Sequence, residues 1–190
     1  MIHLLKLVSV FILAVFISSC ADQITDTNYT NDEALKDVIL APGDLSEEEV
    51  AGLIYMRQEE KVAHDVYTTL AQTWNLSILT NIASSEQSHM DAVKKMINKY
   101  QLTDPVTDET VGVFSDPEFQ TMYDDLVLQG QQSPSETMLV GQAIENKDIE
   151  DLNTYISVTD NNDILKMYDR LLAASERHLS SFTVHITPAY

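Results

Sequence analysis

From residue 46 onward, apolar side chains recur at intervals of three and four positions, which is the spacing of one face of an α-helix. No stretch alternates apolar and polar residues in the manner of a half-buried β-strand. The pattern predicts four long helices and one short helix, over residues 46–74, 77–100, 117–129, 135–156 and 162–186. The expected fold class is therefore all-α.

Local signals support the predicted helix ends. Ser46, followed three residues later by Glu49, has the spacing of a capping box, and Asp116-Pro117 combines an N-cap residue with a proline at the first helical position. A long connection that contains the short helix separates the second long helix from the third. This connectivity is typical of a ferritin-like four-helix bundle with one long crossover carrying an extra short helix, rather than of a simple up-and-down bundle.

The first 45 residues are predicted to lie outside the bundle domain, which we place at residues 46–187. Lys6 precedes an apolar run and then Ile17-Ser18-Ser19-Cys20, which has the composition of a secretory signal peptide over residues 1–20. This run is short for a stable transmembrane helix, which needs about 20 apolar residues. Residues 21–45 are polar and predict a flexible tether.

Cys20 is the only cysteine in the chain, and it stands where the apolar run ends. This position resembles the bacterial lipobox, in which the cysteine becomes the lipidated N-terminus after cleavage. We therefore expect a lipid-anchored protein of the bacterial cell envelope, facing the periplasm or the outer surface and held to the membrane by its N-terminal lipid. An ordinary signal peptide or an uncleaved anchor are the alternatives.

Acidic residues outnumber basic ones, 30 to 11, for a formal net charge of −19. Removal of residues 1–20 takes away one lysine and no acid, so the mature chain carries 10 basic and 30 acidic residues, or −20. Such a surface repels the phosphates of nucleic acid and attracts cations. Nucleic acid is thus excluded as a partner.

Each long apolar stripe is interrupted near its middle by an acid or an imidazole. Burying an ionised carboxylate without a partner costs several kcal/mol, and Arg57, Lys61 and Arg177 are too few nearby cations to pair with all of them. A divalent cation would compensate these groups together, and oxygen and nitrogen ligands suit iron, manganese or zinc. The candidate metal ligands are Glu60, Glu86, His89, Glu145 and His178.

The motif Glu86-Gln87-Ser88-His89 carries the most weight in this interpretation. Side chains at positions i and i+3 share one helical face, so one helix can offer a carboxylate and an imidazole to a single metal centre. Alone, such a motif is common. In the middle of a buried stripe, with Glu60 and Glu145 at matching depth, it predicts a metal site rather than a solvated face.

These same residues carry a family resemblance. Glu60 to Tyr67 is similar to the first helix of rubrerythrin-type proteins of the ferritin-like superfamily. The closer resemblance is to an uncharacterised bacterial family, domain of unknown function 2202 (DUF2202), over roughly residues 46–186. The segments that resemble its signatures are Tyr55–Lys61, Asn81–Glu86, Ile144–Ile149 and Arg177–Leu179.

The resemblance implies ligand roles for the five candidates, with Glu86 as a bridging or terminal carboxylate. A full di-iron pattern would have a glutamate three residues before His178, where this chain has Ser175. One metal ion, or two ions with Asp148 or His64 completing the set, are both open. Glu59 lies about 100° from the stripe and is expected to be exposed.

The predicted function is a lipid-anchored metal-binding protein with one or two ions, iron before manganese or zinc, which reacts with oxygen or peroxide if it is redox active. The chain lacks the paired cysteines of a rubredoxin-like domain, so an external donor would supply electrons. The alternatives are a metal-sequestering protein without turnover and a structural or interaction bundle without metal. Substrate, catalytic residues and oligomeric state are left open.

Overall fold

The computed structural model describes residues 45–186, with side chains up to residue 184. Within this range the chain is helical and contains no strand, which confirms the all-α prediction. The predicted helix ends agree with the observed ones to within two residues. The helices are α1 (Glu47–Trp74), α2 (Ser77–Lys99), α3 (Pro117–Gly130), α4 (Pro134–Val158) and α5 (Asn162–Ile186).

Four helices begin at side-chain caps: α1, α3, α4 and α5, the last where Asn161 accepts from the backbone N–H of Asp163 at 3.1 Å. The capping box predicted at Ser46 is present: its hydroxyl accepts from the backbone N–H of Glu49 at 3.1 Å, and the Glu49 carboxylate accepts from the Ser46 N–H at 3.0 Å. Asp116 and Ser133 cap α3 and α4, each directly before a proline. These caps satisfy backbone donors that a helix start leaves without an intrahelical partner.

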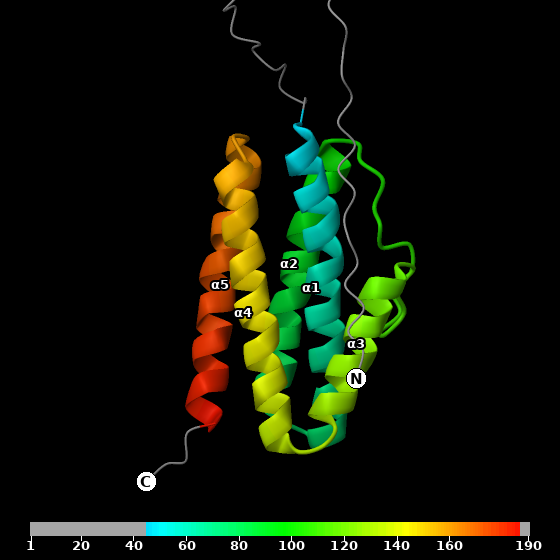
Figure 1. Ribbon diagram of the computed structural model, residues 1–190, viewed down its shortest axis with the longest axis vertical. Helices are drawn as coiled ribbons and strands as arrows, with labels where there is room; N and C mark the ends of the chain where they lie inside the picture. Colours follow the sequence, from blue (N-terminus) through cyan, green and yellow to red (C-terminus); the bar gives the residue numbers. More distant parts are fainter. Residues whose placement is uncertain (1–44, 187–190) are drawn as a thin grey trace, which may run out of the picture. The chain divides into compact units, whose positions relative to one another are not determined.

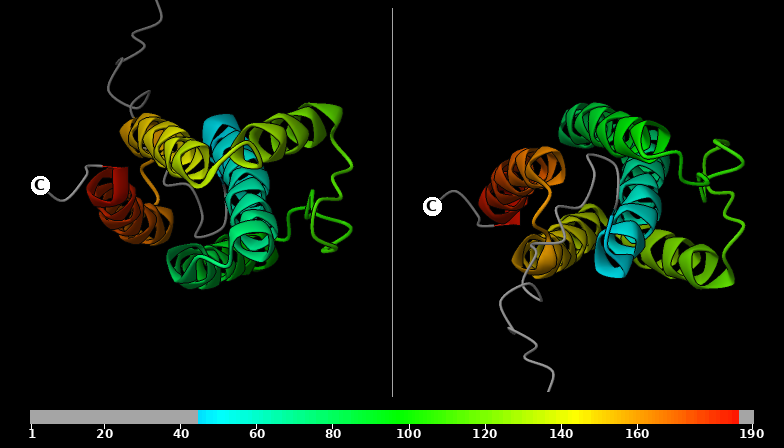
Figure 2. Two further views of the ribbon diagram at one scale, coloured as in Figure 1. Left: turned by 90° about the horizontal axis from the view of Figure 1, so that it is seen from below. Right: turned by 90° about the horizontal axis from the view of Figure 1, so that it is seen from above.

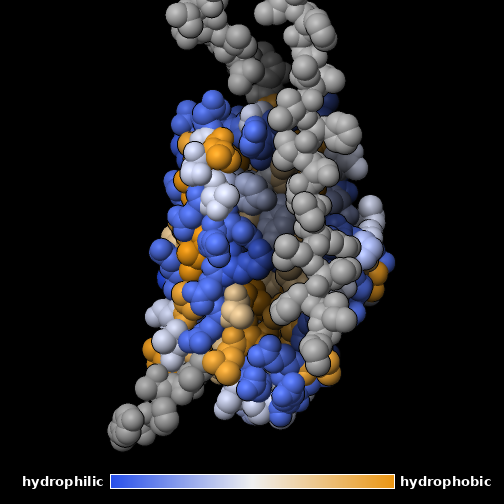
Figure 3. All heavy atoms as spheres, in the orientation of Figure 1, coloured by the Kyte–Doolittle hydropathy of each residue, from blue (hydrophilic) through white to orange (hydrophobic). Residues whose placement is uncertain are grey.

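The four long helices form two antiparallel hairpins, α1 with α2 and α4 with α5, joined by the predicted crossover (Figure 1). α1 also packs against α4, and α2 packs against α5, as the end-on views show (Figure 2). The helix of the crossover, α3, lies outside this group of four against α1 and α4. Hydrophilic residues cover most of the face over α4 and α5 that Figure 3 shows.

None of the described helices combines the length and the apolar character needed to cross a membrane. The predicted signal peptide with Cys20, and the tether up to residue 44, lie outside the described residues.

The core consists of two apolar clusters separated along the bundle. On α1, Leu53 and Met56 belong to one cluster and Val66 and Leu70 to the other, with Glu60 between them. The other three long helices are arranged in the same way. Each contributes apolar residues to both clusters, with a buried polar segment between them. The amphipathic stripes therefore bring the polar segments of four helices into a single layer with apolar side chains on both sides.

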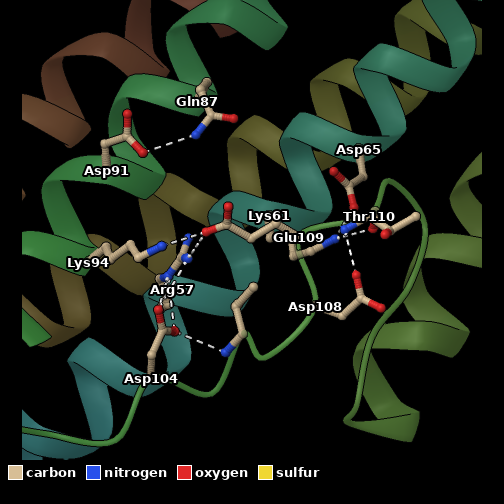
Figure 4. Close-up of polar contacts among 11 residues, drawn as sticks. Arg57, Lys61, Asp65, Gln87, Asp91, Lys94, Asp104, Asp108, Glu109 and Thr110 are labelled. Carbon is tan, nitrogen blue, oxygen red and sulfur yellow. Dashed lines mark hydrogen bonds and ion pairs between the residues drawn. The ribbon is translucent and has the colours of Figure 1, made fainter.

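Two buried cations on α1, Arg57 and Lys61, attach the crossover to the bundle (Figure 4). The Arg57 guanidinium contacts Asp104 at 3.1 Å and Glu109 at 3.2 Å, and Glu109 also contacts Lys94 of α2 at 2.6 Å. We call this set, together with Lys61 and its partners Asp65 and the carbonyl of Thr110, the crossover clamp. Arg57 and Lys61 thus have partners of their own and do not neutralise the polar layer.

Replacing Asp104 with asparagine is expected to destabilise the protein. Arg57 is fully buried, and losing one partner of a buried pair costs about 3–5 kcal/mol. Because Glu109 remains, we expect a loss of about 2 kcal/mol in the free energy of unfolding. Urea denaturation would measure it, with Glu150→Gln on the exposed face of α4 as the control. An unchanged unfolding midpoint for Asp104→Asn would show that the clamp contributes little.

Candidate metal centre

The five residues predicted as metal ligands meet in the polar layer between the two apolar clusters. α1 contributes Glu60, α2 contributes Glu86 and His89, α4 contributes Glu145, and α5 contributes His178. The three glutamates are at most 2 % exposed. Their ligand atoms form two groups: Glu60, Glu86 and His89 in one, and Glu86, Glu145 and His178 in the other. Within each group all the ligand atoms lie within 4.8 Å of one another.

Glu86 belongs to both groups and turns one oxygen toward each. Its Oε2 lies 2.7 Å from Nδ1 of His89, and its Oε1 lies 2.8 Å from Nδ1 of His178. Glu60 approaches the same nitrogen of His89 at 3.2 Å, and Glu145 approaches that of His178 at 3.6 Å. The two imidazole rings face each other with centroids 5.8 Å apart. A single carboxylate therefore stands between two Glu/His pairs.

Mutual charge compensation explains the protonation of this layer. Burial raises the pKa of Glu86, but the close contacts and positive charges of the His178 and His89 imidazoles outweigh it and bring that pKa to about 2. Burial lowers the pKa of His89, yet Glu60 and Glu86 raise it to about 11. The pKa of His178 rises to about 9 because Glu145 and Glu86 outweigh its burial. Both imidazoles are thus cations at neutral pH when no metal is bound.

The remaining carboxylates of the layer resist ionisation. Burial, followed by the charge of Asp148, raises the pKa of Glu60 well above its ordinary value. Burial raises the pKa of Glu145 to about 7 and that of Asp148 to about 6. The layer therefore holds more acid groups than its own two imidazoles can neutralise.

Several buried polar atoms of this layer have no hydrogen-bond partner: Glu60 Oε1, Glu86 Oε1, Asp148 Oδ1 and His178 Nδ1. Glu86 Oε1 and His178 Nδ1 are close enough for an ion pair, but they are not aligned for a hydrogen bond. An unsatisfied buried polar group costs about 1–3 kcal/mol, so four in one place call for compensation. Carboxylate oxygen and imidazole nitrogen are ligands for iron, manganese and zinc, and these residues could hold a metal ion.

Asp148 and Ser175 clarify the departure from the di-iron pattern. Ser175 donates its hydroxyl to Oδ2 of Asp148, which lies one turn beyond Glu145 on α4 and is 5 % exposed. Asp148 belongs to the layer, where its charge raises the pKa of Glu60, although it is part of neither three-residue group. At the position where a di-iron pattern has a glutamate on α5, this chain therefore has Ser175 on α5 and the buried carboxylate of Asp148 on α4 beside it.

The structure does not bring His64 into either group. Its Nδ1 lies 2.8 Å from Asp65, and Asp65 also binds Lys61 and the backbone N–H of Gly112 in the crossover. His64 therefore sits beside the crossover clamp. The spacing in the sequence could not decide whether His64 faces the polar layer or the crossover. A residue four positions from Glu60 lies on the same side of the helix but can stand at either edge of that face.

Two further residues shape the surroundings of the layer. Tyr67 donates its hydroxyl to Oε1 of Glu145 at 2.7 Å and so fixes the orientation of that carboxylate. Glu59 is 4 % exposed, so the prediction that it is exposed is wrong. It lies in an apolar pocket of about 170 Å³ lined from α1, α3 and α4, 3.6 Å from Lys147. α3 packs against this side of α1. The apolar periodicity of α1 does not reveal this contact, so it could not predict that Glu59 is buried.

Comparisons with known proteins agree with this architecture. The family model described as "Uncharacterized protein domain (DUF2202)" matches residues 49–188. The uncharacterized protein MJ0754 of Methanocaldococcus jannaschii is 49 % identical over 138 residues, which are 73 % of this chain and 75 % of that protein. The crystal structure of hypothetical protein MJ0754 from Methanococcus jannaschii matches with a TM-score of 0.75 and 47 % identity, covering 77 % of this chain and 84 % of that one. The chain belongs to the DUF2202 family.

Proposed function

We propose that this protein binds two divalent transition-metal ions, iron by preference, with Glu86 as the carboxylate that bridges them. The observation that carries the proposal is the position of Glu86, whose two oxygens face two different Glu/His pairs. Each oxygen of Glu86 thus faces a separate glutamate and histidine, and each such set could hold one ion.

The charge of the layer supports two ions rather than one. Glu60, Glu86, Glu145 and Asp148 together carry four negative charges when ionised. Two divalent cations would balance them with both imidazoles neutral, which is the form in which histidine binds metal. Four carboxylates and two imidazoles are also the donor set of ferritin-like di-iron and di-manganese proteins. Asp148 would supply the carboxylate that Ser175 lacks.

We further propose that the iron form reacts with oxygen or peroxide, the redox chemistry being that of the metal. The chain itself holds the ligands in place: Tyr67 orients Glu145, Ser175 orients Asp148, and the two apolar clusters limit the access of water along the bundle. Because Cys20 is the only cysteine, electrons for repeated turnover would come from a separate donor.

Replacing Glu86 with glutamine tests the metal site. The intact protein should bind about two equivalents of Fe(II), one for each group that shares Glu86. Glu86→Gln should retain less than about half of this metal, because the bridging charge is lost. Glu59→Gln is the matched control: it removes a buried carboxylate next to Glu60 that belongs to neither group. Equal metal content in both variants, measured by elemental analysis, would contradict the proposal.

Oxidation of bound Fe(II) separates a reactive centre from a metal store. With limiting oxygen or peroxide, the intact protein and Glu59→Gln should oxidise Fe(II) at the same rate, and Glu86→Gln should be about tenfold slower or more. Stopped-flow absorbance and an oxygen electrode would follow the reaction. Tight binding of Fe(II) without faster oxidation than in buffer would favour a sequestering protein over a redox enzyme.

We also propose that Cys20 anchors the protein to the membrane of the cell envelope through a lipid, facing the periplasm or the outer surface. The support is the sequence that precedes Cys20, with its short apolar run and two serines. In cell fractionation, the wild-type chain should sediment with membranes and Cys20→Ser should not. Equal membrane association of the two would count against the anchor.

A further inference from the structure

A groove of about 510 Å³ runs between α2 and α5 and reaches the polar layer. Its floor is apolar, made by Ala92 and Met96 of α2 and by Met167, Leu171 and Ala174 of α5. His89 lines it as well, so one residue is shared by the groove and the proposed metal centre. The residues of α5 that line it extend from Asp163 to Arg177, which corresponds to roughly 20 Å along a helix.

Four basic side chains border this floor: Lys95 of α2 and Lys166, Arg170 and Arg177 of α5. The three on α5 are spaced at intervals of four and seven residues, which places them on one face of the helix. Asp163 is the one acidic lining residue, and it is paired with Lys99 outside the groove. The groove is thus a basic region on a chain whose formal charge is −19.

The four basic residues of the groove differ from the other described lysines and arginines in having no ion-pair partner. In the described part of the chain, every other lysine or arginine has a carboxylate partner: Arg57, Lys61, Lys94, Lys99 and Lys147. None of the four basic residues of the groove has an ion-pair partner in that part of the chain. With 30 acidic residues in the sequence, partners are abundant. Within the described residues, the lysines and arginines without an ion-pair partner therefore all border one groove.

We propose that the groove binds a small organic anion, a carboxylate with an apolar tail, beside the metal centre. The carboxylate would lie among the lysines and arginines, since a guanidinium can bind it through two parallel hydrogen bonds. The tail would cover the apolar floor, and the volume suits a small molecule rather than a protein surface. That this anion is the substrate of the centre rests on the proposed function; its binding does not.

Calorimetry with metal-free intact protein and octanoate as the probe tests the groove. Octanol has the same tail without the charge, and inorganic phosphate has charge without a tail. Both should bind with an affinity at least about tenfold lower than that of octanoate. No octanoate binding up to millimolar concentration would overturn the proposal. Phosphate binding as tight as octanoate would also overturn it, because the apolar floor would then play no part.

Two double variants locate the binding. Lys95→Gln with Arg170→Gln removes two groove cations and should weaken octanoate binding about tenfold or more. Lys94→Gln with Lys147→Gln removes the same charge from positions whose ion-pair partners also lie outside the groove lining, and it should leave the affinity unchanged. Equal weakening in both would indicate a general charge effect and overturn the assignment. Circular dichroism checks that both variants fold.

Iron content, measured on the same proteins, keeps this test separate from that of the proposed function. Both double variants should bind Fe(II) like the intact protein, since neither removes a residue of the two Glu/His groups. Octanoate binding without metal binding would leave the groove assigned and reject the metal centre. Metal binding without octanoate binding would support the metal centre and reject the anion site in the groove.

Discussion

Four carboxylates in the middle of a helical bundle repel one another and lose the hydration that would stabilise their charge. Glu60, Glu86, Glu145 and Asp148 are all held in this way. Two imidazoles, a tyrosine hydroxyl and a serine hydroxyl contact them, yet several of their atoms stay without a partner. The apolar clusters on both sides supply the packing energy that keeps such a layer closed. The layer of carboxylates is thus maintained by the rest of the core rather than by its own contacts.

The distribution of basic residues follows from the same constraint. A lysine or arginine within reach of the layer would pair with its carboxylates, which would then be less available to a metal ion. Instead, Arg57 and Lys61 are buried on α1 but directed to the crossover, where Asp104 and Glu109 contact Arg57 and the carbonyl of Thr110 accepts from Lys61. The remaining lysines and arginines of residues 45–184 lie in surface ion pairs or along the groove. The lysine and arginine side chains of the described residues thus lie near the polar layer but outside it.

Much of this architecture could be predicted from the sequence, because both the helical period and the polar interruptions are local signals. Glu86 and His89 share a face whatever the neighbouring helices do, and Glu60, Glu145 and His178 stand at the same depth in their stripes. His64 contacts Asp65, which the crossover binds through the backbone N–H of Gly112, and the burial of Glu59 depends on α3 and α4, so in both cases the deciding contacts come from segments far away in the sequence. The pairing of Ser175 with Asp148 joins two helices, so neither helical wheel alone shows it.

The sharing of Glu86 makes the two groups unequal in their dependence on the tertiary fold. Glu60, Glu86 and His89 all belong to the α1–α2 hairpin, whereas the second group joins Glu86 to Glu145 and His178 of the α4–α5 hairpin. An ion in the first group would stabilise one hairpin, and an ion in the second would fasten the two hairpins together. Loading would then be ordered, with the first position filled during assembly of the chain and the second only once the bundle has closed.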